Sequence, residues 1–162
     1  MENYDGAIKK EEMAGKYVFW DIDGTLAPFR FNGHIGDPLG THHGMSLTEI
    51  EEGCFYYRVP SKHMQKVVKT CNAKKQFILG HCHSPKEISD KHKWVPENFP
   101  EISELFLVED EVPKYTVVLK YCEENGIDPK ETVLIDDKIP LLIEAERHGI
   151  NAYHISSFLD WD

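Results

Sequence analysis

Short apolar runs alternate with stretches of helical periodicity along most of the chain. A short apolar run bounded by turn-forming residues is typical of a buried strand, and apolar residues at i, i+3, i+4 and i+7 indicate one face of a helix. The runs that predict strands are Tyr17–Trp20, Gln76–Leu79, Leu105–Val108, Thr132–Ile135 and Ala152–Ile155. The helical faces follow Pro60-Ser61 (Met64, Val67, Val68, Cys71) and run over Pro113–Asn125 and Pro140–His148, and a further helix opens at Ser84.

Capping signals support these helices. Ser84 can cap a helix whose first turn holds Pro85, and Glu87 then completes a capping box. Gly126 and Gly149 stand where two of the helices are expected to end.

Strands that alternate with helices imply a parallel sheet covered by helices on both faces. The 162 residues suit one compact domain. We therefore predict a single Rossmann-like α/β domain over 1–162, with a loose lead-in up to about residue 15. Residues 26–59 are irregular and rich in glycine, and a loop of this length is usually functional or partly disordered.

Composition narrows the function. Acidic residues outnumber basic ones, 28 to 18, for a formal charge of −10, which disfavours general binding to nucleic acid. No apolar stretch approaches the length of a membrane span. The four cysteines form no Cys-x-x-Cys pair, so we expect reduced thiols in a cytoplasmic protein.

Two pairs of acids directly follow predicted strands. Asp21 and Asp23 come after the first strand, and Asp136 and Asp137 after the fourth. Ligands of an open parallel sheet bind beyond the carboxyl ends of its strands, so these acids should converge there. One such aspartate is most often a turn former or a helix cap, but two pairs in this pattern indicate a site. Clustered carboxylates need a cation, and Mg²⁺ suits oxygen ligands of this kind best.

These acids suggest phosphate chemistry. A carboxylate aimed at phosphorus can act as a nucleophile and form an aspartyl-phosphate. A second carboxylic acid nearby can protonate the departing oxygen and later deprotonate water.

The same residues resemble a known family. Asp21-Ile22-Asp23-Gly24-Thr25 resembles the DxDGT signature of phosphatases of the haloacid dehalogenase (HAD) superfamily, and Val133–Asp137 resembles its acidic metal motif. Lys114, before the fourth strand, fits the position of the superfamily's lysine. The resemblance runs from about residue 16 to 155.

The resemblance implies a role for each residue. Asp21 would be the nucleophile and Asp23 the general acid and base, and Lys114 would counter the charge of the nucleophile and of the phosphate. The carboxylates of Asp21, Asp136 and Asp137, with the backbone carbonyl of Asp23, would hold Mg²⁺. Thr25, Gly80 and His81 would contact the substrate.

Gly80 departs from the family pattern. The family usually has Ser or Thr at the end of the second strand, and Gly80 offers no side-chain donor there. We expect backbone N–H groups between Gly80 and Ser84, or the imidazole of His81, to take over. The alternative that His81, Cys82 and His83 bind zinc with His42, His43 and Cys54 lacks a supporting Cys-x-x-Cys pair.

The insert over 26–59 matches the family's flap and is too short for a large cap domain. Arg30 and Arg58 could contact a substrate anion, although a solvated arginine is the default. The aromatic trio Phe55-Tyr56-Tyr57 could stack on a base, although such a trio beside a core strand is more often part of the packing. We expect a phosphohydrolase acting on a small phosphorylated metabolite, with a nucleotide substrate and a homo-oligomer left open. A phosphotransferase of the same fold and a non-catalytic binding protein are the alternatives.

Overall fold

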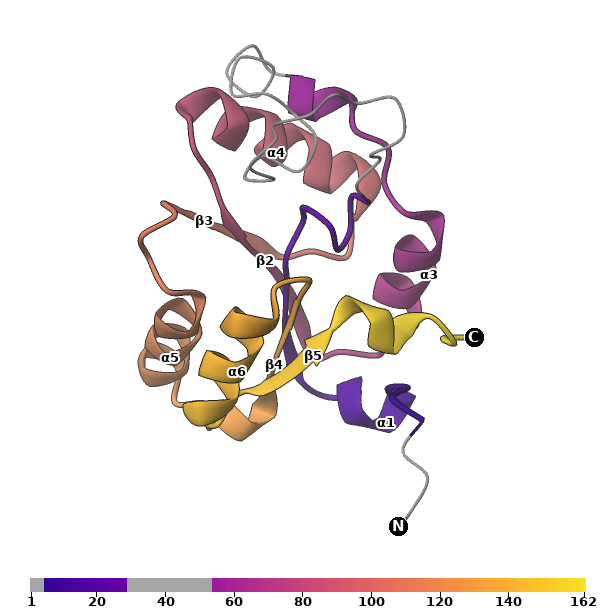
Figure 1. Cartoon of the computed structure of the whole chain (residues 1–162), viewed down its shortest axis with the longest axis vertical. Coiled ribbons are helices and arrows are strands. Elements are labelled where there is room, and N and C mark those ends of the chain that lie inside the picture. Colours follow the sequence, from indigo (N-terminus) through magenta and orange to yellow (C-terminus); the bar gives the residue numbers. More distant parts are fainter. Residues whose placement is uncertain (1–4, 29–53) are drawn as a thin grey trace.

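The described strands form one parallel sheet. The computed structural model describes residues 5–28 and 54–162. Within them the strand order is β3-β2-β1-β4-β5, and each neighbouring pair is parallel (Figure 1). The strands are β1 (Tyr17–Trp20), β2 (Lys75–His81), β3 (Glu104–Val108), β4 (Thr132–Asp136) and β5 (Asn151–His154). The predicted α/β sheet is therefore confirmed.

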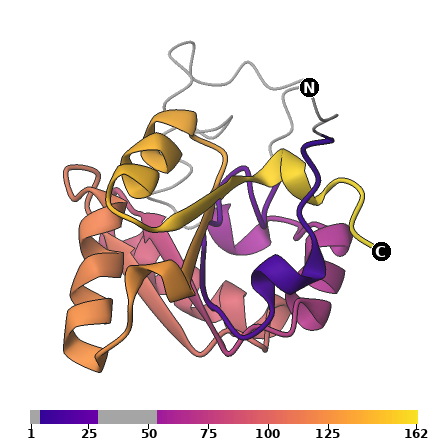
Figure 2. The ribbon, with the colours of Figure 1, turned by 90° about the horizontal axis from the view of Figure 1, so that it is seen from below.

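Helices cover both faces of this sheet. The helices are α1 (Lys10–Met13), α3 (Lys62–Thr70), α4 (Pro85–Asn98), α5 (Lys114–Asn125) and α6 (Ile139–Arg147). Trp20 and Ile78 share one buried cluster with residues of α1, α3 and α4, and Phe19 and Phe77 share the other with residues of α5 and α6. Figure 2 shows α5 and α6 on one side of the sheet and α1 and α3 on the other. Successive residues of β1 thus point to opposite faces, as the alternation of a strand requires.

Most helix boundaries follow the local signals in the sequence. Ser61 and Ser84 accept hydrogen bonds from Met64 N–H and Glu87 N–H, and so cap α3 and α4. Gly126 follows α5 with φ of 64°, a left-handed conformation that glycine adopts at little cost. The Glu87 carboxylate, however, accepts from His83 N–H at 2.6 Å, one residue before the position that a capping box requires.

Two segments differ from the prediction. Lys10–Met13 form a single helical turn instead of a loose lead-in, because Met13 is fully buried in the core. β2 continues through Gly80 and His81, which pair with Leu107 and Val108 of β3, so Gly80 lies within a strand. Of the predicted flap, residues 29–53 lie outside the described part, and Cys54–Tyr57 form a short 3-10 helix.

Candidate active site

Asp21 lies where β1 passes into a tight turn. Its backbone N–H donates to Ile135 O at 2.9 Å, so the chain still follows β4 at this point. The carbonyl of Ile22 then accepts from three N–H groups, those of Thr25, Leu26 and Ala27. Gly24 has φ of 78°, a region open to glycine but strained for other residues, which lets the chain turn sharply after Asp23.

The predicted acids of β1 and β4 meet at the carboxyl edge of the sheet. Trp20 is level with Ile135, so the residues that follow each strand come together. One carboxylate oxygen from each of Asp21, Asp136 and Asp137 lies within 4.8 Å of the others. Oδ1 of Asp137 is buried and has no hydrogen-bond partner among the described residues. An oxygen-rich cluster with an unpaired buried acceptor fits a hard divalent cation such as Mg²⁺.

Lys114, the first residue of α5, joins two of these carboxylates. Its ammonium donates to Asp21 Oδ1 at 2.7 Å and to Asp136 Oδ2 at 2.6 Å, and the residue is only 3% exposed. An ammonium has three N–H donors. The described residues supply acceptors for two of them.

Burial and charge set the ionisation of the cluster. Burial raises the pKa of Asp21 to about 7, with Asp136 and Asp23 adding to the rise and Lys114 opposing it. Burial also raises the pKa of Asp137 to about 6, with the neighbouring Asp136 contributing. Burial alone would raise the pKa of Asp136, but the attraction and hydrogen bond of Lys114, together with hydrogen bonds from Lys138 N–H and Asp137, lower it overall. Asp136 thus keeps its charge. Near neutral pH Asp21 is about half protonated, whereas Asp137 is mostly ionised, and a bound cation would displace the remaining protons.

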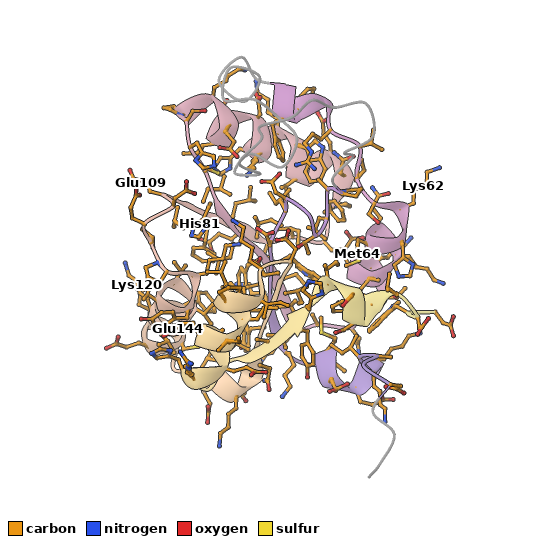
Figure 3. The ribbon with its side chains drawn as sticks, viewed as in Figure 1. Lys62, Met64, His81, Glu109, Lys120 and Glu144 are labelled. Atoms are coloured by element: carbon orange, nitrogen blue, oxygen red, sulfur yellow. The ribbon has the colours of Figure 1, made fainter. Side chains whose placement is uncertain are left out.

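The three residues expected to contact substrate have different surroundings. The Thr25 hydroxyl donates to Asp21 Oδ2 at 3.3 Å, so it orients the carboxylate. His81 lies at the carboxyl end of β2, between α4 and α5 in the view of Figure 3, and its Nε2 donates to Val112 O at 2.8 Å. Burial lowers the pKa of His81, so its ring is neutral and Nδ1 acts as an acceptor. A Cβ added at Gly80 would meet the side chains of Leu107 and Ile78 at 3.6 and 4.0 Å, which is ordinary contact.

Asp23 is held by two cations that do not belong to its own turn. Arg58 forms an ion pair with Oδ1, and Lys91 of α4 donates to Oδ2 at 3.0 Å. The Arg58 guanidinium also donates to the carbonyl oxygens of Ala27 and Pro28. Arg58 was expected from the sequence only as a candidate for binding a substrate anion, and its observed partner is a carboxylate of the site. Arg30 lies outside the described residues.

The sequence analysis did not identify Lys91, and it assigned Glu87 only to a capping box. Both are buried, and Glu87 Oε1 accepts from the Lys91 ammonium at 2.9 Å. The i, i+4 spacing of an acid and a lysine is a weak signal, because most such pairs lie on solvated helix faces. Trp94 and Val95, three and four residues after Lys91, are apolar and are the sequence signal that this face of the helix points inward.

Two N–H groups at the start of α4 have side-chain acceptors from the same segment. The N–H groups of His83 and Glu87 donate to Glu87 and Ser84, respectively. The His83 N–H, one of the groups expected to bind phosphate, therefore already has the buried Glu87 carboxylate as its acceptor.

The aromatic and zinc hypotheses also lose support. Phe55 is buried and packs edge-on against Trp94 at 5.7 Å, so it is not available to stack on a base. His83 pairs with Asp110 at 2.7 Å. Within residues 5–28 and 54–162 the acidic trio is the one cluster with metal-ligand spacing, and His42 and His43 lie outside these ranges.

Comparison with known proteins finds similar structures but no similar sequences. No protein-family model and no curated protein matches the chain significantly. A HAD-family enzyme from Bacteroides thetaiotaomicron, in complex with magnesium and inorganic phosphate, superposes with a TM-score of 0.58 at 18% identity, over 92% of this chain and 98% of that one. A haloacid dehalogenase-like hydrolase from Streptococcus pneumoniae superposes with a TM-score of 0.52 at 14% identity, over 91% of each chain.

These likenesses extend over nearly the full length of each chain, and the sheet order and the acids at its carboxyl edge agree with the resemblance in the sequence. The chain therefore has the fold of the HAD-type hydrolases.

Proposed function

We propose that this protein is a magnesium-dependent phosphohydrolase that acts on small phosphomonoesters through an aspartyl-phosphate on Asp21. The observation that carries the proposal is the convergence of Asp21, Asp136 and Asp137 on a spot no wider than 4.8 Å, with Lys114 bonded to two of them. The carboxylates of such a buried cluster carry negative charge that a bound cation would neutralise. The cation would also attract a phosphate group to the site.

Mg²⁺ would be held by the carboxylates of Asp21, Asp136 and Asp137 together with the backbone carbonyl of Asp23. When bound, it would supply positive charge for the phosphate oxygens and keep Asp21 ionised. The unpaired Oδ1 of Asp137 supports this assignment, because a buried acceptor without a donor is costly unless a ligand satisfies it.

The reaction then proceeds in two displacements. A carboxylate oxygen of Asp21 attacks phosphorus, and the bond from phosphorus to the ester oxygen breaks as Asp23 gives that oxygen a proton. The Asp23 carboxylate next takes a proton from water, whose oxygen attacks phosphorus and releases phosphate from Asp21. Lys114 offsets charge on Asp21 and on the phosphate, and Thr25 keeps the Asp21 carboxylate oriented. Gly80 and His81 would contact the phosphate directly.

The substrate and setting are also proposals. The HAD-family enzyme from Bacteroides thetaiotaomicron was crystallised with inorganic phosphate, which favours a small phosphorylated substrate here. Phe55 gives no support to a nucleotide, because its ring is packed in the core. We retain a cytoplasmic location on cysteine usage alone, since Cys71, Cys82 and Cys122 are buried free thiols. Of the described helices, none has the length and apolar character to cross a membrane.

Turnover of p-nitrophenyl phosphate tests the proposed function. Excess chelator should abolish turnover and added Mg²⁺ should restore it, because the acidic cluster repels a phosphate dianion without a cation. A panel of sugar phosphates, nucleoside monophosphates and phosphopeptides, each assayed separately for phosphate release, then identifies the substrate class. Turnover that persists in excess chelator would contradict the metal-dependent mechanism.

A further inference from the structure

Lys91 occupies an unusual place for a lysine. It lies in the middle of α4, is 0% exposed, and reaches the carboxyl edge of the sheet from the face opposite to α5 and Lys114. Burial of an ammonium is costly unless its charge is paired and its hydrogen bonds are made. Neither Lys91 nor its partner Glu87 takes part in the phosphoryl transfer described above, so their burial needs another explanation.

All three N–H donors of the Lys91 ammonium have partners within the protein. They point to Asp23 Oδ2 at 3.0 Å, Glu87 Oε1 at 2.9 Å and His81 O at 3.3 Å. The Phe55 ring covers the ammonium at 4.8 Å from its centroid. Because no donor remains, Lys91 is not placed to bind a substrate anion. It differs in this from Lys114, for which the described residues supply only two acceptors.

The Glu87 carboxylate fixes Lys91 in turn. Its second oxygen accepts from the backbone N–H of His83 at 2.6 Å, directly after β2. The chain of contacts therefore runs from the backbone that follows β2, through Glu87 and Lys91, to Asp23. Its last contact is with Oδ2, while Arg58 binds Oδ1.

We propose that Lys91, anchored by Glu87, is the positioning residue that fixes the orientation of the Asp23 carboxyl group, which in its protonated form gives the proton to the leaving oxygen. The inference rests on the proposed function, in which Asp23 is the general acid. The Asp23 side chain remains 17% exposed while it is bonded to Lys91. Lys91 thus restricts rotation of the carboxylate without blocking its access to substrate.

The test compares two substrates that differ in how much they need the acid. p-Nitrophenyl phosphate releases a stable phenolate, whereas phenyl phosphate has a more basic leaving oxygen that benefits from a proton. The variant is Lys91→Met with Glu87→Gln, which removes the ammonium and its paired charge together and so avoids an isolated buried charge. Lys93→Met, an exposed lysine on the same helix, is the matched control.

The quantity to measure is kcat/KM in saturating Mg²⁺, because it reports only the steps up to the first transfer to Asp21. For the double variant we expect kcat/KM on phenyl phosphate to fall about 10- to 100-fold, the size of effect that slight misplacement of a catalytic group produces. On p-nitrophenyl phosphate it should fall by less than about threefold, since little acid catalysis is needed. Lys93→Met should match the wild type on both.

An equal loss on both substrates, or no loss on either, would overturn the role of Lys91. If circular dichroism shows that the double variant does not fold, Glu87→Gln alone serves instead. It keeps the ammonium and should show the same preference for p-nitrophenyl phosphate with a smaller loss, and equal effects on both substrates would again overturn the inference. Wild-type protein with no Mg²⁺-dependent turnover of either substrate would overturn the proposed function itself, and the inference with it.

Discussion

The charge of Lys114 should weaken the binding of Mg²⁺ and strengthen the binding of phosphate. Its ammonium lies 2.7 Å from Asp21 Oδ1 and 2.6 Å from Asp136 Oδ2, two of the proposed metal ligands. The attraction of Asp21 and Asp136 outweighs burial and raises the pKa of Lys114, so it stays charged. A second cation beside these carboxylates repels Mg²⁺, whereas the same charge attracts a phosphate dianion.

Lys114→Met therefore separates the two effects. We expect turnover of p-nitrophenyl phosphate to fall about 10²- to 10³-fold, as for other losses of a group that stabilises transition-state charge. Mg²⁺ binding, measured by titration calorimetry without substrate, should stay the same or tighten. Lys120→Met on the same helix is the control, because that side chain is 75% exposed. A variant that loses Mg²⁺ binding but keeps turnover would refute this role.

At the scale of the element, the turn between β1 and the flap decides how Asp21 and Asp23 are presented. Gly24 adopts φ of 78° there, and Gly15, far from the acids, adopts φ of 72° with open space around its Cα. Alanine costs about 1–2 kcal/mol in this left-handed region. Alanine should therefore be similarly strained at both positions, but only position 24 lies next to the acids of the site.

Gly24→Ala and Gly15→Ala should each lower the free energy of unfolding by about 1–2 kcal/mol in urea denaturation. Only Gly24→Ala should also reduce turnover, because its strain shifts Asp23 relative to Asp21. Comparable activity in the two variants would show that the turn does not set the geometry of the acids.

Signals contained within a few residues allowed most elements to be predicted. Tyr17–Trp20 form β1 with the predicted bounds, and the caps at Ser61 and Ser84 and the glycine at 126 work locally. The acids after β1 and β4 could be placed together because all parallel strands end at one edge.

What escaped prediction depends on contacts between distant segments. Lys91 reads as a solvated helix residue until α4 is packed against the turn after β1, where Asp23 lies 68 positions away. The role of Arg58 has the same origin, since Arg58 forms an ion pair with Asp23, which lies 35 positions earlier in the chain. Gly80 extends β2 only because β3 offers partners beside it.

For the whole molecule, the ionisation of the acidic cluster couples stability to pH and metal. The pKa of Asp21 is about 7 and that of Asp137 about 6 in the folded protein, against 3.8 for an ordinary aspartate. Between pH 4 and 7 the folded state thus binds more protons than the unfolded state, so stability without metal should fall as pH rises through this range and then level off. Mg²⁺ competes with these protons, so it should stabilise most above pH 7.

Thermal unfolding with and without saturating Mg²⁺ measures this coupling. We expect the melting temperature to rise by about 5 °C or more at pH 8 and by less than about 2 °C at pH 5, from the usual relation between ligand excess and stability. Potassium chloride at equal ionic strength is the control. A Mg²⁺ effect at pH 5 as large as that at pH 8 would place the ion elsewhere.

The central claim is that Asp21 is the nucleophile, and the turnover number of Asp21→Asn tests it most directly. The carboxamide has nearly the same shape but cannot attack phosphorus, so the variant should fold, as judged by circular dichroism. Its kcat on p-nitrophenyl phosphate in excess Mg²⁺ should be lower than that of the wild type by about 10⁴-fold or more, as for the loss of other catalytic nucleophiles. A folded Asp21→Asn variant with a turnover number near that of the wild type would contradict the account.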